Sequence, residues 1–557
     1  MNADLVVRNG MVMDGTGNPG IAADVAMSDG RIVAIGSDLH GDTVLDASGA
    51  VVAPGFIDIH THYDAQVFWD PAMTPSSFHG VTTVVLGNCG FTLAPTRPEH
   101  HTLLARTLEQ VEDMDFAMLQ SGIPWDFVTF PEYLESVARH GCALNYAAYI
   151  GHTAVRLFVM GDAAYERHAT PTELESMQAV VRDGLQAGAA GFSTSAGTLH
   201  RGADGKPIPS RFANPAEFEA LANVVAETRR GVVGLTAGDE WDLDTVYELQ
   251  HRLGIPFTWA ALMAHESGWH DRMLEKNDEW WARGGAVWPQ VSPRPLAFSV
   301  AMHSPYLLNS NPVFAELIGK SLDARRSAYA DPDWRVRAED AFVDSMPQRW
   351  DTFVIGESNS HPEAVDRRLL ELNQGEDRHP IHTLLDLALD ESDLGLRVRI
   401  VLANDYRPGV ELLLQQDNCT LGLSDAGAHT GQICDAVQTT DFLALVRDRE
   451  LMPLEKAVRK MSGVQADIFG FADRGYLRPG MAGDIVVFDP ATVGPGPVRR
   501  ATDFPGDTAR LTADEPTGMR HIIVNAVPIR VSGEHQEAEI ASRPGQFVRP
   551  AARTAHG

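Results

Sequence analysis

The chain contains few cysteines and no long apolar run. Only four of its 557 residues are cysteine, and none form a Cys-x-x-Cys pair, so neither a disulfide framework nor a zinc ribbon is expected. The sequence begins with a polar segment that carries Asp4 and Arg8, which does not resemble a signal peptide. No run of about 18 uncharged apolar residues follows it. These features predict a cytoplasmic protein without a membrane span.

Positive charge is also scarce. The chain has 45 Lys and Arg residues against 75 Asp and Glu residues, which gives a formal net charge of −30. Such a chain repels nucleic-acid phosphates and anionic membrane faces, so we expect neither as its main partner. The apolar fraction of 44% is ordinary for a globular protein and excludes disorder, collagen and coiled coil for the chain as a whole. A small-molecule partner is expected, and a homo-oligomer is left open.

Both ends of the chain have the pattern of short β-strands. Residues 1–55 alternate apolar runs with turn pairs such as Asn9-Gly10. Residues 471–535 contain a further strand and a hairpin around Asn525. Since 1–55 is too short to be stable alone, we expect the two regions to form one small β-sandwich domain. Residues 536–557 are polar and rich in Pro, Arg and Ala, and are expected to be a loosely packed tail.

The central part, residues 56–470, alternates strands with helices. Repeated βα units predict a parallel sheet, and about eight of them predict an α/β fold of the (β/α)8 TIM-barrel type. A charged helical stretch within about residues 290–350 breaks this rhythm and is expected to be an insertion over the barrel mouth. The expected strands after the first are 82–86, 144–150, 191–194, 232–235, 257–259, 286–288, 398–402 and 420–423.

The sharpest motif follows the first expected barrel strand. Residues 55–59 read as that strand, and His60-Thr61-His62 comes directly after it. Alternate residues of a strand point the same way, so both imidazoles face one side at the strand end where barrel enzymes place their catalytic groups. Neutral imidazole is a good zinc ligand. With 21 histidines in the chain, such a pair also arises by chance, and its context has to decide.

That context resembles a known family. Residues 54–62, PGFIDIHTH, are similar to the first-strand metal motif of the amidohydrolase superfamily. The chain resembles most closely the D-aminoacylase (N-acyl-D-amino-acid deacylase) group. The matching segments are 5–20, 80–90, 151–156, 191–194, 423–429, 475–480 and 482–489. The resemblance implies a hydrolase that cleaves a linear, non-peptide C–N amide bond with the help of zinc.

The resemblance also implies roles for single residues. Cys89 is implied to be a metal-binding thiolate, which needs a cation to stay deprotonated; a small buried apolar residue is the alternative. Asp425 is implied to be a metal ligand and the catalytic acid and base, where a turn or N-cap aspartate is the alternative. His152 is open between a catalytic contact with the substrate and a buried structural histidine. Arg156 is expected to bind a carboxylate.

The sequence departs from the family pattern at two metal positions. Ala237 and Ala261 stand where the family has histidines, and alanine cannot coordinate a metal. We therefore expect one zinc ion, or another divalent metal, per chain. Its expected ligands are His60, His62, Cys89 and Asp425, and the candidates for an additional ligand are Asp239, Glu240 and His265.

The residues that would bind the substrate differ as well. Asp239 and Met263 replace the arginine and lysine with which the family binds a substrate carboxylate, so a free N-acyl-D-amino acid is not the expected substrate. Trp259, Met263 and Trp288 suggest an apolar pocket. Arg294 is a candidate anion partner, and a surface loop arginine is the alternative.

Two other functions remain open, because a fold does not determine a reaction. One is a cyclic amidase or deaminase on the same fold. The other is a metal-free pseudo-enzyme or binding protein. The reaction product and the metal content of the protein distinguish these functions.

Overall fold

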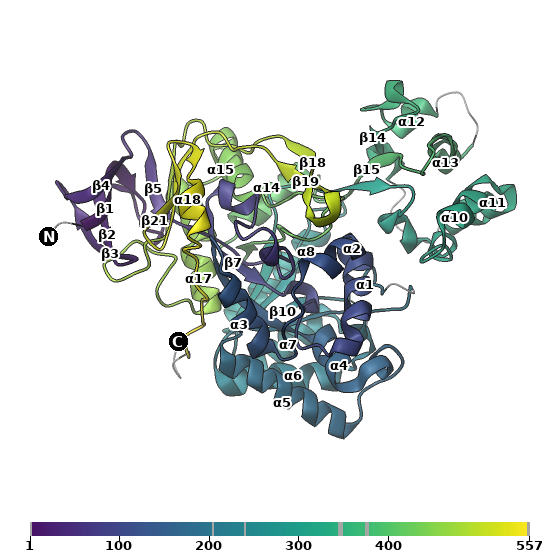
Figure 1. Ribbon diagram of the computed structural model, residues 1–557, viewed down its shortest axis with the longest axis horizontal. Helices are drawn as coiled ribbons and strands as arrows, with labels where there is room; N and C mark the ends of the chain where they lie inside the picture. The colour runs from purple at the N-terminus through teal and green to yellow at the C-terminus, as the bar shows by residue number, and fades with distance from the viewer. Residues whose placement is uncertain (1–2, 203–204, 239–240, 343–348, 374–377, 554–557) are drawn as a thin grey trace.

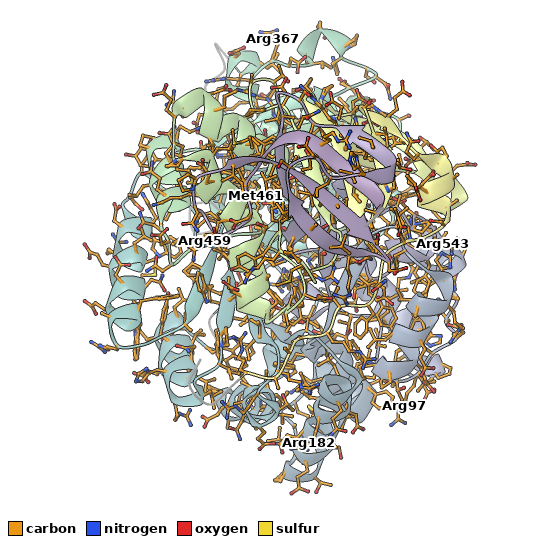
Figure 2. All side chains as sticks on the ribbon, turned by 90° about the vertical axis from the view of Figure 1, so that its left-hand side faces the viewer. Arg97, Arg182, Arg367, Arg459, Met461 and Arg543 are labelled. Carbon is orange, nitrogen blue, oxygen red and sulfur yellow. The ribbon has the colours of Figure 1, made fainter. Side chains whose placement is uncertain are left out.

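The computed structural model describes residues 3–202, 205–238, 241–342, 349–373 and 378–553. Figure 1 shows a barrel with its helices in the centre, a small sheet on one side and an insertion that projects on the opposite side. In Figure 2 the small sheet lies in front, while Arg182 of the barrel helices and Arg367 of the insertion point outward at opposite ends. No helix among the described residues is both long enough and apolar enough to cross a membrane.

The barrel consists of one eight-stranded sheet within the described residues. Its strands, all paired in parallel, are β6 (Phe56–Asp58), β7 (Val81–Leu86), β8 (Asn145–Gly151), β9 (Gly191–Ser195), β10 (Val232–Thr236), β11 (Phe257–Ala260), β12 (Val287–Val291) and β16 (Thr420–Leu421). The first and last strands meet through a parallel bridge between Thr61 and Ala426, where His62 N donates to Ala426 O over 2.7 Å. The predicted α/β barrel is confirmed.

Local sequence explains these elements. All residues of β7 are buried, which matches the continuous apolar run of a strand that is covered on both faces. Helix α5 (Pro171–Ala187) begins with a Thr170–Glu173 capping box and ends at Gly188, which has a φ of 110°. The other helices of this part are α1 (His101–Glu112), α2 (Phe116–Gly122), α3 (Phe130–His140), α4 (His152–Met160), α6 (Pro215–Thr228), α7 (Leu243–Leu253), α8 (Trp269–Ala282), α14 (Arg407–Gln415), α15 (Gln438–Arg449), α16 (Leu454–Met461) and α17 (Gly463–Phe469).

The small sheet draws strands from both ends of the chain, as expected. Its order is β22-β21-β20-β17-β5-β1-β2-β3, and β4 pairs with β1. The strands are β1 (Ala3–Val12), β2 (Ile21–Ser28), β3 (Arg31–Gly36), β4 (Gly41–Asp46), β5 (Val51–Pro54), β17 (Ile485–Phe488), β20 (Met519–Val524), β21 (Val527–Val531) and β22 (Glu534–His535). The two chain ends join where β5 pairs with β17. A separate hairpin, β18 (Val498–Phe504) with β19 (Thr508–Ala513), follows β17. The domain bounds stay a prediction.

The C-terminal segment is more ordered than the sequence suggested. It contains α18 (Glu537–Ala541), and Tyr146 at the start of β8 exchanges backbone hydrogen bonds with Gln546 and Val548. The Val548 side chain is buried in a cluster with Ile57 and other residues of the barrel strands. The expectation of a loosely packed tail is therefore wrong for the described residues up to 553, because this segment covers the amino-terminal end of the barrel.

The insertion is larger than predicted. It contains a three-stranded antiparallel sheet of β13 (Leu296–Ala301), β14 (Val354–Glu357) and β15 (Arg397–Ala403), together with α9 (Pro312–Ala315), α10 (Leu322–Ala330), α11 (Pro332–Ala341), α12 (Leu369–Leu372) and α13 (Pro380–Asp390). The prediction that 398–402 is a barrel strand is wrong, because β15 pairs with β13 and β14. Val398 and Ile400 enter the core of the insertion while Arg399 between them is exposed. This alternation is typical of a half-exposed antiparallel strand.

Candidate metal centre

Three side chains with metal-binding atoms converge at the carboxyl end of the first two barrel strands. His60 and His62 follow β6, and Cys89 lies in the turn after β7. One ligand atom of each lies within 4.8 Å of the others. The Cys89 Sγ atom is 3.5 Å from His60 Nε2. Because β6 and β7 are neighbouring parallel strands, their ends bring these groups together as the sequence predicted.

Asp425 adds a carboxylate from the opposite end of the sheet. It follows β16, which approaches β6 where the barrel closes. Its Oδ1 atom lies 3.0 Å from His60 Nε2 and 3.7 Å from His62 Nε2. The Asp425 side chain is 12% exposed, whereas both histidines are almost fully buried. A small molecule can therefore reach the carboxylate while the imidazoles stay inside.

Each histidine also has a partner on the other side of its ring. Gln290 Oε1 on β12 lies 2.7 Å from His60 Nδ1, and Glu112 Oε1 on α1 lies 3.5 Å from His62 Nδ1. Partners of this kind fix the tautomer and orientation of a metal-binding histidine, which leaves Nε2 free for the metal. The sequence analysis missed both residues. Gln290 was detectable as a polar residue near the end of a barrel strand, whereas nothing in the sequence marks Glu112.

The electrostatics of the four groups suit a cation. Burial opposes ionisation of Cys89, but the two imidazoles lower the pKa of its thiol to about 6. Burial disfavours protonated His60, but Cys89 and Asp425 raise its pKa to about 10. Burial likewise opposes ionisation of Asp425, yet His60 and His62 hold its pKa well below the usual range. Two anionic groups thus face two imidazoles, a donor set that fits zinc.

Two alanines stand at positions where the sequence analysis expected further metal ligands in the family. Ala237 and Ala261 follow β10 and β11 and are partly exposed. Asp239 and Glu240 lie outside the described residues. His265 is exposed and hydrogen-bonds Ser267 Oγ over 2.8 Å. Among the described residues, it does not join the group formed by the two histidines and the cysteine.

His152 is part of a buried network. Its Nδ1 atom lies 2.7 Å from Thr194 Oγ1 and its Nε2 atom 2.9 Å from Glu217 Oε1. Arg156, which was expected to bind a carboxylate, donates to Glu217 Oε2 over 2.6 Å. His152 is fully buried, and neither ring nitrogen is free for a substrate. The structure thus corrects the catalytic prediction for His152 and supports its alternative, a buried structural histidine.

The two tryptophans do not form a substrate pocket. Thr258 on β11 bonds Gln290 inside the barrel, so the neighbouring Trp259 points outward, where it packs against Trp269 of α8. Trp288 is partly buried, packs against a buried cluster that includes residues of the barrel strands, and contacts Trp281. These contacts do not support the prediction that Trp259 and Trp288 line an apolar substrate pocket. Met263 is half-buried in the segment after β11.

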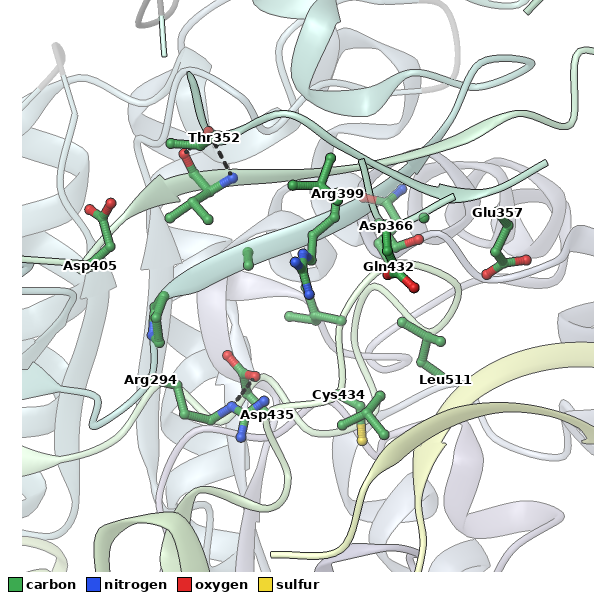
Figure 3. A pocket seen from close by; sticks show the side chains of 18 of the residues that line it. Arg294, Thr352, Glu357, Asp366, Arg399, Asp405, Gln432, Cys434, Asp435 and Leu511 are labelled. Atoms are coloured by element: carbon green, nitrogen blue, oxygen red, sulfur yellow. Dashed lines mark hydrogen bonds and ion pairs between the residues drawn. The ribbon is translucent and has the colours of Figure 1, made fainter. Parts of the chain in front are cut away.

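Arg294 lines a cleft of about 720 Å³ between the insertion sheet and the loop after β16. Figure 3 shows its guanidinium directed toward Asp435, with Nε 2.7 Å from Asp435 Oδ1. Arg294 also forms an ion pair with Asp441. Because two carboxylates already balance its charge, the structure does not support Arg294 as the partner of an anionic substrate.

Replacing Gln290 with leucine is expected to weaken zinc binding about 10- to 100-fold. Gln290 Nε2 donates to Thr258 Oγ1, so its Oε1 atom is the acceptor that His60 Nδ1–H requires. Leucine has a similar size but no acceptor. Zinc affinity is measured by competition with a chelator. Gln465→Leu is the control, because Gln465 is equally buried and its described hydrogen bonds involve no histidine. Equal losses in both variants would contradict this role.

Comparison with known proteins agrees with this geometry. The Amidohydrolase family matches residues 43–525. N-acyl-D-glutamate deacylase of Alcaligenes xylosoxydans xylosoxydans is 30% identical over 98% of this chain and 96% of its own length. N-acyl-D-aspartate deacylase of the same organism is 29% identical over 98% and 95%.

Solved structures give the same result. A D-aminoacylase studied for its binuclear metal centre superposes with a TM-score of 0.69 at 26% identity, over 98% of this chain and all of that one. The N-acyl-D-glutamate deacylase of Bordetella bronchiseptica, in complex with zinc and a phosphonate inhibitor, has the same score and identity over 99% of this chain and all of that one. The resemblance read from the sequence is confirmed. The family match over residues 43–525 includes the candidate metal centre and the strands β5 and β17, and the chain belongs to the amidohydrolase family.

Proposed function

We propose that this chain is a metal-dependent hydrolase of a linear amide bond, related in activity to the N-acyl-D-amino-acid deacylases. The convergence of His60, His62, Cys89 and Asp425 at the carboxyl end of the barrel carries the proposal. Two of its relatives are deacylases by name. One similar structure holds zinc and a phosphonate that mimics the tetrahedral intermediate of its reaction.

One zinc ion per chain fits these residues. His60 and His62 would hold it through Nε2, Cys89 through its thiolate and Asp425 through its carboxylate. When bound, such an ion polarises a carbonyl group and lowers the pKa of water. We propose one ion rather than two, because Ala237 and Ala261 provide no ligand atoms.

Amide hydrolysis also needs a side chain that transfers a proton to the departing nitrogen. Asp425 supplies the only carboxylate among the four proposed ligands, and its side chain is 12% exposed, so it can accept a proton at the site and return it to the departing nitrogen. His60 and His62 are held by Gln290 and Glu112 and serve to fix the geometry.

The substrate we propose is a small amide other than a simple free N-acyl-D-amino acid. Met263 provides no positive charge at the mouth, and Arg294 is neutralised by Asp435 and Asp441. A carboxylate of the substrate would therefore lack its expected partners among these residues.

Metal analysis and product analysis test the function together. We expect about one zinc per chain and the release of a carboxylic acid and a free amine from amide substrates. N-acetyl-D-amino acids and their carboxyl-amidated derivatives are the matched pair of substrates, and the amidated forms should be hydrolysed faster. Ammonia from a cyclic amidine would instead identify a deaminase. Absence of metal after zinc supplementation, together with no hydrolysis, would indicate a binding protein.

A further inference from the structure

The turn that carries Cys89 has an unusual backbone. Cys89 has a φ of 55°, and it lies between Gly87 and Gly90, which both have a φ of 77°. A non-glycine residue in the left-handed region costs free energy unless its surroundings hold it there. The direction of the Cys89 thiol therefore depends on what fixes this turn.

We propose that Ser193 on β9 is the positioning residue that fixes the turn and thereby aims Cys89 Sγ at the metal centre. Its Oγ atom donates to Gly87 O over 2.5 Å and accepts from Gly90 N over 3.1 Å. One hydroxyl thus binds the backbone on both sides of Cys89. Ser193 is fully buried, so water cannot readily replace it.

The other contacts of the turn act from a different side. Asp64 Oδ2 accepts from Gly87 N over 2.9 Å, and Asn88 Nδ2 donates to Thr61 O and Val85 O. These bonds tie the turn to β7 and to the segment after β6. Gly90, which follows Cys89, is held by Ser193 from the direction of β9. Without Ser193, the segment after the thiol loses its attachment to that strand.

A small shift of this turn matters because the other ligands come from elsewhere. His60 and His62 follow β6 and Asp425 follows β16, so only Cys89 moves with the turn. Ligand distances in a well-formed metal site lie within about 0.2 Å of their usual values. Thr236 Oγ1 lies 3.4 Å from Cys89 Sγ and restrains the sulfur but not the backbone.

The inference rests on the proposed metal site. Binding of Co²⁺ tests the metal site and the role of Ser193 separately. In the Co²⁺-loaded protein, a cysteine ligand produces a sulfur-to-metal charge-transfer band in the near ultraviolet. We expect this band in the wild type and a weaker, shifted band in Ser193→Ala. Zinc affinity of Ser193→Ala, measured against a chelator, should fall about 10- to 100-fold. Ser193→Cys, which keeps a weak donor of similar size, should recover part of the affinity.

Ser462→Ala is the matched control. Ser462 is equally buried and donates one bond to Val458 O. It should lower thermal stability of the metal-free protein to a similar extent without changing the cobalt band. A wild-type protein without the band would overturn the metal site itself. A wild-type band that persists unchanged in Ser193→Ala, with zinc affinity within twofold, would overturn the role of Ser193 alone.

Discussion

Replacing Asp425 with alanine is expected to lower kcat/KM by about a thousandfold, while most of the zinc stays bound. Asp425 Oδ1 faces both imidazoles and belongs to the only carboxylate among the proposed ligands. His60, His62 and Cys89 remain to hold the metal in the variant. The measurement is turnover of the best amide substrate, with zinc content determined on the same sample.

Two further variants make this result specific. Asp425→Asn keeps the size and one oxygen but cannot accept the proton, so it should be nearly as inactive as the alanine variant. Asp435→Asn removes a buried carboxylate of the same loop that pairs with Arg294 rather than with the histidines. It should retain turnover within about tenfold, an effect close to 1.4 kcal/mol in activation free energy. Near-normal turnover of Asp425→Ala would contradict the mechanism.

The second large effect concerns stability. Replacing Asp484 with alanine is expected to lower the free energy of unfolding by about 3–5 kcal/mol. Asp484 and Arg474 are each only 4% exposed, and Arg474 Nη1 donates to Asp484 Oδ2 over 2.6 Å. Asp484 also accepts from Asn145 Nδ2 and from Asn525 N. These partners come from barrel strand β8 and from the turn between β20 and β21, so Asp484 joins the barrel to the small sheet.

Most of this cost arises from what the substitution leaves behind. Burial raises the pKa of Asp484 despite the attraction of Arg474, so desolvation opposes the charged form of this carboxyl group. The variant leaves Arg474 Nη1 buried without the Asp484 carboxylate, which is unfavourable, while Asp473 still contacts Nε of the same guanidinium. Chemical denaturation measures the loss. Arg474→Met combined with Asp484→Ala should recover part of the stability, because it removes the unpaired charge.

Asp473, the residue directly before Arg474, provides the control for Asp484→Ala. Its side chain is 40% exposed and contacts Arg474 Nε and Arg31 at the surface. Asp473→Ala should therefore cost less than about 1 kcal/mol. Similar losses for Asp473→Ala and Asp484→Ala would show that burial of the network does not govern its contribution.

Much of the site could be predicted because its residues stand in local motifs. His60 and His62 share one face of a strand end by alternation alone, and Cys89 and Asp425 follow strands of the same parallel sheet. Parallel strands in a barrel bring their carboxyl ends to one side. The meeting of these four residues at one end of the barrel could therefore be expected from sequence, with Cys89 and Asp425 assigned as ligands by the family resemblance. The joining of both chain ends also followed, since neither β region could be stable alone.

The tertiary structure decided what depends on pairs of residues far apart in the chain. Gln290 and Glu112 reach the histidines from β12 and α1, and no local pattern connects them with His60 or His62. The strand at 397–403 has barrel-like composition, but pairing with β13 and β14 places it in the insertion. The sequence analysis placed Trp259 in a substrate pocket. The Thr258 side chain points into the barrel, so the neighbouring Trp259 points outward. The sequence determined which groups could bind a metal, because ligand chemistry and strand alternation are local. Only the packed barrel determined which residues orient the ligands, because those contacts join residues that are far apart in the chain.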